Sequence, residues 1–165
     1  MEYICGVTFA PFACAGAFFK PVAKESLAMM KERTGANFVI FVPGGLQETP
    51  QSEEICFTSK ATMEDDELIA MIEYAKEIGL RVALKPTVNC KNGTWRAHIN
   101  FFDEDVPCEP KWGNWFTSYT AFQLHYAKIA EQYGCEMFIA GCEMVMSEHL
   151  SLIHISEPTR RSYIS

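Results

Sequence analysis

Two kinds of hydrophobic pattern alternate along the chain. Short apolar runs without polar alternation, which are typical of strands buried on both faces, occupy residues 3–10, 38–42, 81–86 and 136–141. Between these runs, apolar residues recur at helical spacing in residues 21–34, 62–78 and 112–133. The sequence therefore predicts an α/β protein in which strands and helices alternate and the strands are parallel.

A glycine ends each predicted helix, and one or two residues separate it from the next strand. These glycines are Gly35, Gly79 and Gly134. The strand-to-helix loops, by contrast, are long and contain Trp, Arg, Asn and Gly. This repeat is typical of a (β/α)8 TIM barrel, in which the loops after the strands form the active face. A doubly wound sheet shares the alternation, but the glycine-rich phosphate loop that usually follows its first strand is absent from the sequence.

Three local patterns refine this prediction. Residues 62–65 (TMED) are close to a capping box and predict a helix N-cap at Thr62. Asn92-Gly93 is a strong turn signal and predicts a hairpin between residues 88–90 and 94–99. Residues 43–61 are polar and begin with Pro43, so we expect a long irregular loop there.

Composition excludes several classes of partner. The net charge is −7 with a pI of about 5.1, and basic residues cluster only at Arg160-Arg161, which argues against nucleic acid and anionic membranes. The seven cysteines are odd in number and form no C-x-x-C pair, so neither zinc nor a disulfide framework is indicated, and no cofactor motif is present. The N-terminal apolar stretch lacks a basic n-region and is interrupted by Pro11, so we expect a cytoplasmic protein without a signal peptide.

Glu143 is the first candidate for chemistry because it follows the last apolar run, 136–141. Catalytic groups of barrel enzymes lie at the C-terminal ends of strands. As a general acid, Glu143 would need a raised pKa, which neighbours such as Met144, Val145 and Trp rings could supply by desolvation. A solvated loop glutamate is the alternative.

An ordered set of short motifs resembles glycoside hydrolase family 113, a family of barrel enzymes similar to β-mannanases. The set consists of Trp95-Arg96 and the segments 112–119 (WGNWFTSY), 125–127 (HYA) and 139–143 (IAGCE). Residues 6–9, Gln47 and residues 84–86 agree in order and spacing. Thr87 and Asn89 depart from the family, which often has His and Asp there.

The resemblance implies a retaining glycoside hydrolase that cleaves β-1,4-mannan or a related plant polysaccharide. Glu143 would be its general acid/base, and the nucleophilic glutamate would lie beyond the end of this chain. The side chains expected to contact the sugar are Gln47, Lys85, Asn89, Trp95, Arg96 and Trp112. Aromatic faces stack on pyranose rings, and Arg donates hydrogen bonds to hydroxyl groups. For each of these residues a purely structural role is the alternative.

From Leu150 onward the sequence resembles the translation of a sequencing-library adapter. This resemblance predicts two parts: residues 1–149, a partial (β/α) barrel catalytic domain, and residues 150–165, a non-native tail. The alternative is a natural polar tail. A closed barrel needs eight strands and roughly 250 residues, so we expect a barrel truncated to about its first four units and inactive on its own. A non-catalytic carbohydrate-binding half-barrel, or an inert fragment, is the competing function, and the open sheet edges predict aggregation.

Overall fold

The computed structural model describes residues 3–10, 15–101 and 109–147; the adapter-like tail lies outside these residues. The main sheet has four parallel strands in the order β1 (Gly6–Phe9), β2 (Phe38–Phe41), β4 (Arg81–Leu84) and β6 (Met137–Phe138). The helices between them are α1 (Pro21–Thr34), α2 (Asp65–Glu77) and α3 (Glu109–Gln132). The predicted alternation and the parallel sheet are confirmed.

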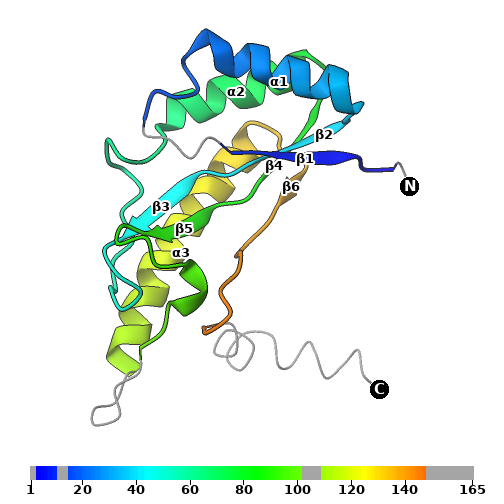
Figure 1. Cartoon of the computed structure of the whole chain (residues 1–165). Coiled ribbons are helices and arrows are strands. Elements are labelled where there is room, and N and C mark those ends of the chain that lie inside the picture. Colours follow the sequence, from blue (N-terminus) through cyan, green and yellow to red (C-terminus); the bar gives the residue numbers. More distant parts are fainter. Residues whose placement is uncertain (1–2, 11–14, 102–108, 148–165) are drawn as a thin grey trace, which may run out of the picture.

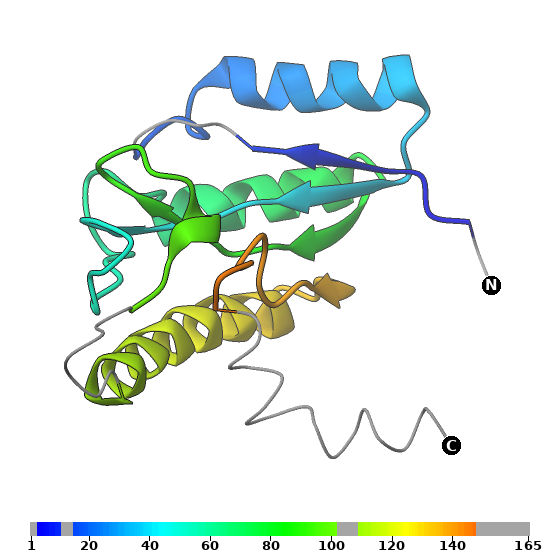
Figure 2. The ribbon, with the colours of Figure 1, turned by 60° about the horizontal axis from the view of Figure 1, so that its bottom comes forward.

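The three helices lie along one side of the main sheet in the order α1, α2, α3 (Figures 1 and 2). The central strands β2 and β4 are buried on both faces, as expected: Val39, Phe41, Ala83 and Leu84 are fully covered. The helices contribute Leu27, Leu68, Met71, Ile72 and Phe122 to the same core. The sheet is therefore one layer of a core that the helices close from outside, and β1 and β6 are its two edges.

Two further strands prolong the centre of the sheet. β3 (Gly44–Gln47) pairs in parallel with β5 (Thr87–Cys90), in the register that already joins β2 to β4. The prolonged strands are interrupted at Pro43 and Pro86, because proline has no N–H to donate to the ladder. The prediction of an irregular loop from residue 43 is thus wrong for Gly44–Gln47, since the proline interrupts this strand without ending it.

The threonine after Pro86 repairs part of this interruption. In a parallel ladder the carbonyl of Lys85 would accept from the N–H of residue 43, which is proline. The hydroxyl of Thr87 donates to that carbonyl at 3.1 Å instead. The backbone N–H of Thr87 meanwhile donates to Pro43 O at 3.0 Å, so the strands stay in register toward their C-terminal ends.

The predicted hairpin after Asn92-Gly93 is wrong. A turn is present, with Gly93 at φ 80° and Thr94 N donating to Asn92 Oδ1 at 3.0 Å. The residues that follow form the short 3-10 helix η1 (Arg96–His98) and do not return as a strand. The carbonyl of Val88, which a hairpin partner would use, accepts from the side chain of Arg96 at 2.8 Å.

Glu64, and not Thr62, is the N-cap of α2, so the predicted cap is wrong by two residues. Glu64 N donates to Glu67 Oε1 at 2.8 Å, so the capping box joins Glu64 and Glu67, two residues further along the chain than predicted. The fully buried Glu67 carboxylate also accepts from Gly16 N at 2.9 Å and Phe18 N at 2.8 Å. The helix start therefore holds the loop that follows β1.

No helix within the described ranges is long and apolar enough to cross a membrane.

Candidate active site

The loops that follow β5 and β6 meet at the C-terminal ends of the strands (Figure 1). Met146 N donates to Ala97 O at 3.1 Å, which joins the segment after β6 to η1. Ile139 N donates to Leu84 O at 2.9 Å, so the ladder continues one residue past β6 before the chain leaves the sheet. Glu143 follows directly in this segment, beside Trp95 and Arg96.

The backbone of Glu143 is unusual. Its φ of 56° lies in the left-handed region, and it is the one non-glycine residue of the described ranges with a positive φ. This conformation costs an L-residue about 1–2 kcal/mol and is concentrated at functional sites. Gly141, at φ 86°, provides a second left-handed residue just before it. The chain thus turns sharply after β6, and the turn decides where Glu143 points.

Two donors from one loop bind the Glu143 carboxylate. The indole Nε1 of Trp95 donates to Glu143 Oε2 at 3.0 Å, and Nη1 of Arg96 donates to the same oxygen. Arg96 also donates from Nη2 to Asn89 Oδ1 at 2.7 Å and from Nε to Val88 O. The guanidinium is therefore anchored on β5 while it binds Glu143.

These contacts lower the pKa of Glu143. The hydrogen bond from Trp95 has the largest effect, and the positive charges of Arg96 and Lys85 act in the same direction. The expectation that desolvation by Met144, Val145 and Trp rings raises this pKa is wrong, and Trp95 lowers it through its hydrogen bond. The Glu143 side chain is 49% exposed, so the desolvation that opposes its ionisation is outweighed by the donors.

The structure brings four of the six predicted sugar contacts to Glu143 or its partners. Trp95 and Arg96 bind the carboxylate, Asn89 binds Arg96, and the charge of Lys85 reaches Glu143. Trp95 is 53% exposed, which leaves much of its ring open to solvent. The C-terminal ends of β4, β5 and β6 therefore converge on one polar site, as the barrel prediction requires.

Gln47 and Trp112 lie in the core instead. Gln47 is buried at the end of β3, where its Oε1 accepts from Trp115 Nε1 at 3.1 Å and its Nε2 donates to Thr49 O at 2.7 Å. Trp112 is buried with its ring centroid 4.7 Å from that of Phe101. Their contact with sugar stays a prediction.

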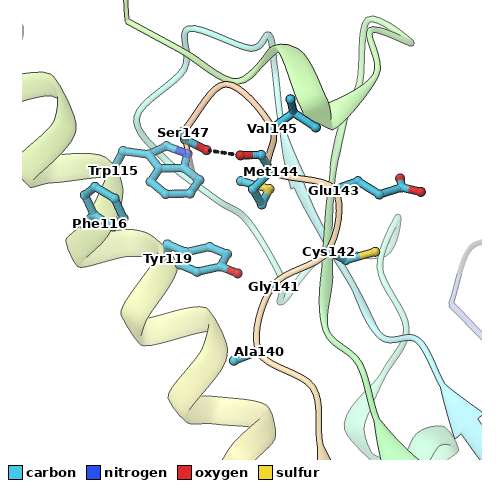
Figure 3. A pocket seen from close by; sticks show the side chains of 10 residues that line it. All are labelled: Trp115, Phe116, Tyr119, Ala140, Gly141, Cys142, Glu143, Met144, Val145 and Ser147. Carbon is cyan, nitrogen blue, oxygen red and sulfur yellow. Dashed lines mark hydrogen bonds between the residues drawn. The ribbon is translucent and has the colours of Figure 1, made fainter. Parts of the chain in front are cut away.

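A cavity of about 400 Å³ lies between α3 and the segment that bears Glu143. Trp115, Phe116 and Tyr119 line its helix side, and Met144 and Ser147 lie opposite. Figure 3 shows the Glu143 carboxylate pointing away from these rings. The Glu143 carboxylate therefore does not point into this cavity, which lies beside α3 and is largely apolar.

Metal-ligating side chains do not gather here. Within the described ranges, no group of three or more His, Cys, Asp and Glu residues could hold a metal ion. The cysteines Cys5, Cys56, Cys90, Cys135 and Cys142 are unpaired. The site offers one carboxylate, its cationic and indole partners, and an exposed aromatic face.

The family model of Glycoside Hydrolase Family 113 matches residues 7–153. The chain belongs to this family. The match begins within β1 and extends past Glu143, and it confirms the resemblance of the ordered motifs. No curated protein matches the chain.

Solved structures of the same family confirm the fold. A GH113 β-1,4-mannanase is 55% identical, with a TM-score of 0.85 over 92% of this chain and 49% of that chain. A GH113 β-1,4-mannanase complex is 52% identical, with a TM-score of 0.85 over 98% and 50%. The GH113 β-mannanase AaManA from Alicyclobacillus acidocaldarius, in complex with ManMIm, is 37% identical, with a TM-score of 0.83 over 98% and 52%.

The chain thus spans about half the length of the solved structures it matches. It is a GH113 fragment with the fold of a truncated TIM barrel, as the glycine-punctuated repeat predicts.

Proposed function

We propose that this chain is part of a retaining hydrolase of β-1,4-mannan or a related plant polysaccharide, with Glu143 as its general acid/base. The single observation behind this role is the placement of Glu143. Its carboxylate is at the C-terminal end of the sheet, on a left-handed backbone, and two neighbouring side chains bind it. The solved relatives at 55% and 52% identity are β-1,4-mannanases, which supports mannan as the substrate.

The mechanism needs Glu143 in both protonation states. The acid form protonates the glycosidic oxygen, and the carboxylate later activates water. A second carboxylate about 5–5.5 Å away, as a retaining site requires, would raise the pKa of Glu143 and favour the acid form. In the described part of the chain, the charges that act on Glu143 are both cationic, Arg96 and Lys85. We therefore expect this chain to lack hydrolytic activity by itself.

The exposed face of Trp95 supports a sugar subsite beside Glu143. Pyranose rings present apolar C–H faces that stack on indole. Asn89, which binds Arg96, and Lys85, whose charge acts on Glu143, offer further donors for sugar hydroxyls. Recognition of mannan by these residues is consistent with an oligosaccharide or polysaccharide partner.

A chimera tests the catalytic proposal. Residues 3–147 are followed by the half of the 55%-identical β-1,4-mannanase that this chain does not cover; we call this protein the barrel chimera. We expect it to release oligosaccharides from mannan and glucomannan, whereas the 165-residue chain does not. Hydrolysis by the 165-residue chain would contradict the need for a second half, and full activity of the chimera with Glu143→Gln would contradict the role of Glu143.

A carbohydrate-binding protein without catalysis is the second candidate. The exposed ring of Trp95, whose N–H is bound to Glu143, favours this candidate, because an exposed indole face can stack on a sugar ring without any catalytic group. Titration of the 165-residue chain with manno-oligosaccharides distinguishes the two. Saturable binding that is lost in Trp95→Ala would support a binding function, and no binding would leave it without support.

We also propose a reducing, cytoplasmic location. The five unpaired cysteines of the described ranges support it, because thiols persist where disulfides do not form. Fractionation of the native host with an antibody against this chain would test the location.

A further inference from the structure

Arg96 uses all three of its guanidinium nitrogens. Nε donates to the backbone carbonyl of Val88, Nη2 donates to the Asn89 amide oxygen, and Nη1 donates to the Glu143 carboxylate. Two of these acceptors belong to β5, and the third belongs to the segment after β6. The Arg96 side chain is only 14% exposed, so this planar fork is enclosed where it joins the two segments.

Glu143 has few other constraints on its side chain. About half of its side chain is exposed, and its other hydrogen-bond partner among the described residues is Trp95, which directly precedes Arg96 in the chain. The backbone at Glu143 lies outside the sheet with a left-handed φ. A carboxylate on such a turn loses its fixed direction unless a rigid partner holds it, since a free side chain visits several rotamers.

We infer that Arg96 is a positioning residue, which fixes the Glu143 carboxylate to the end of β5 through Val88 and Asn89. This role differs from the sugar contact predicted for Arg96, and its meaning for catalysis rests on the proposed function of Glu143. Asn89 then matters through Arg96: a neutral amide orients the guanidinium and leaves its charge to Glu143. An Arg is suited to this task because its fork geometry fixes several acceptors at once.

The charges around Glu143 make the role measurable. Arg96 from η1 and Lys85 from the end of β4 are the cations that act on it. The neighbouring titratable groups are Cys142, which precedes it in the chain, and His98, whose ring centroid lies 6.0 Å from that of Trp95. Loss of the Arg96 contact must therefore raise the pKa of Glu143, although Lys85 and Trp95 still lower it.

The experiment is a pH titration of ¹³C-carboxyl-labelled glutamates in the dilute 165-residue chain, followed by NMR. Glu136, which Arg81 binds at the other end of the sheet, is an internal reference in every spectrum. We expect Arg96→Gln to raise the titration midpoint of Glu143 and to leave that of Glu136 unchanged. We expect Asn89→Ala to raise the titration midpoint of Glu143 by less than Arg96→Gln does. This variant keeps the charge of Arg96, and residue 89 does not contact Glu143, so a rise would come from the lost orientation of the guanidinium.

The outcomes separate the possibilities. An unchanged Glu143 midpoint in Arg96→Gln overturns the inference, as does an ordinary midpoint in the unsubstituted chain. If the midpoint of Glu136 also shifts in Arg96→Gln, that variant has lost its fold, and Asn89→Ala becomes the deciding variant. A raised midpoint of Glu143 with an unchanged midpoint of Glu136 then supports the positioning role, and an unchanged Glu143 midpoint refutes it. In the barrel chimera, the pH–rate profile of Arg96→Gln should shift in the same direction. A shifted titration with an unshifted rate profile would contradict the acid/base role and leave the positioning role in place.

Discussion

Two Arg–Glu pairs lie at opposite ends of the same strands. At the N-terminal end, Arg81 Nε donates to both carboxylate oxygens of Glu136, at 3.0 and 2.8 Å, and Nη2 adds a bond of 2.7 Å. At the C-terminal end, Arg96 binds Glu143. The two carboxylate side chains are equally exposed, at 47% and 49%, and both pKa values are lowered. Burial and charge alone therefore do not distinguish a structural pair from a functional one.

The backbones beneath the two carboxylates distinguish them. Glu136 N donates to Val82 O at 2.9 Å directly before β6, and its side chain binds Arg81, the first residue of the neighbouring strand β4. Glu143 leaves the sheet with a φ of 56° and depends on a loop for its partners. The regular entry into a strand accounts for the Arg81–Glu136 pair, whereas strained turns such as the one at Glu143 cluster at functional sites.

At the N-terminal ends of the strands, the same contact between neighbouring helices also recurs. Lys31 of α1 donates to Ile78 O at the end of α2, and Lys76 of α2 donates to Tyr133 O at the end of α3, at 3.0 Å. A glycine follows each carbonyl; a Cβ at Gly134 would lie 3.0 Å from Lys76 Nζ. The lysines favour the negative end of the next helix dipole. This end is a repeated scaffold, whereas at the C-terminal end the segments that follow β1, β3, β5 and β6 differ from one another.

The largest difference between the two Arg–Glu pairs is expected when the carboxylate of Glu143 or of Glu136 is removed in the barrel chimera. We expect Glu143→Gln to lower kcat on mannan by about 10²–10⁴-fold, the usual range for general acid/base catalysis. Glu136→Gln should keep kcat within about twofold, because its pair lies at the opposite end of the strands. Equal losses in the two variants would show that both pairs act only through stability, which circular dichroism melts of the same samples would reveal.

A large stability effect is expected at Glu67, which holds the loop after β1 at the C-terminal end. Glu67→Ala leaves three backbone N–H groups, those of Gly16, Phe18 and Glu64, without their acceptor. We expect a loss of about 3 kcal/mol or more in urea unfolding of the chimera, at about 1–3 kcal/mol for each unpaired buried donor. The exposed neighbour is the control, and Asp66→Ala should cost less than about 0.5 kcal/mol. Similar costs for the two would mean that the loop is held by other contacts.

The sequence predicted the structure well at the N-terminal ends of the strands and less well at their C-terminal ends. Apolar runs and stop glycines identify strands and helices because they encode register and burial, as at Phe38–Phe41 and Gly35. The path after Asn92-Gly93 was mispredicted because a side chain, Arg96, occupies the carbonyl that a hairpin would use. Glu143 was found as a strand-end carboxylate, but its lowered pKa depends on donors 47 and 48 residues away in the sequence, which no local pattern reveals.

Gln47 tests whether a polar residue at the C-terminal end belongs to the site or to the core. Gln47→Leu would leave the buried indole N–H of Trp115 without its acceptor, at a cost of about 1–3 kcal/mol. Combining it with Trp115→Phe removes both partners, so we expect the double variant to lose less than the sum of the single ones. Urea unfolding of the four proteins in the chimera measures the coupling. If Gln47→Leu leaves stability unchanged but raises KM for mannan, its predicted sugar contact is supported and its core role is not.

The smallest expected effect is on the pH dependence of the melting temperature, which should differ between the two Arg–Glu pairs. Because the folded pKa values of Glu136 and Glu143 are below the ordinary glutamate value, about 4.3, each pair contributes stability above that pH and loses it as the pH falls through the folded pKa. We therefore expect the melting temperature of the chimera to fall below about pH 4.3, with a shallower slope in Glu136→Gln. Glu143→Gln should change this slope less, because in the chimera a second carboxylate beside Glu143 brings its pKa back toward the ordinary value. Equal changes of slope in the two variants would mean that Glu143 meets only its cationic partners even in the completed barrel.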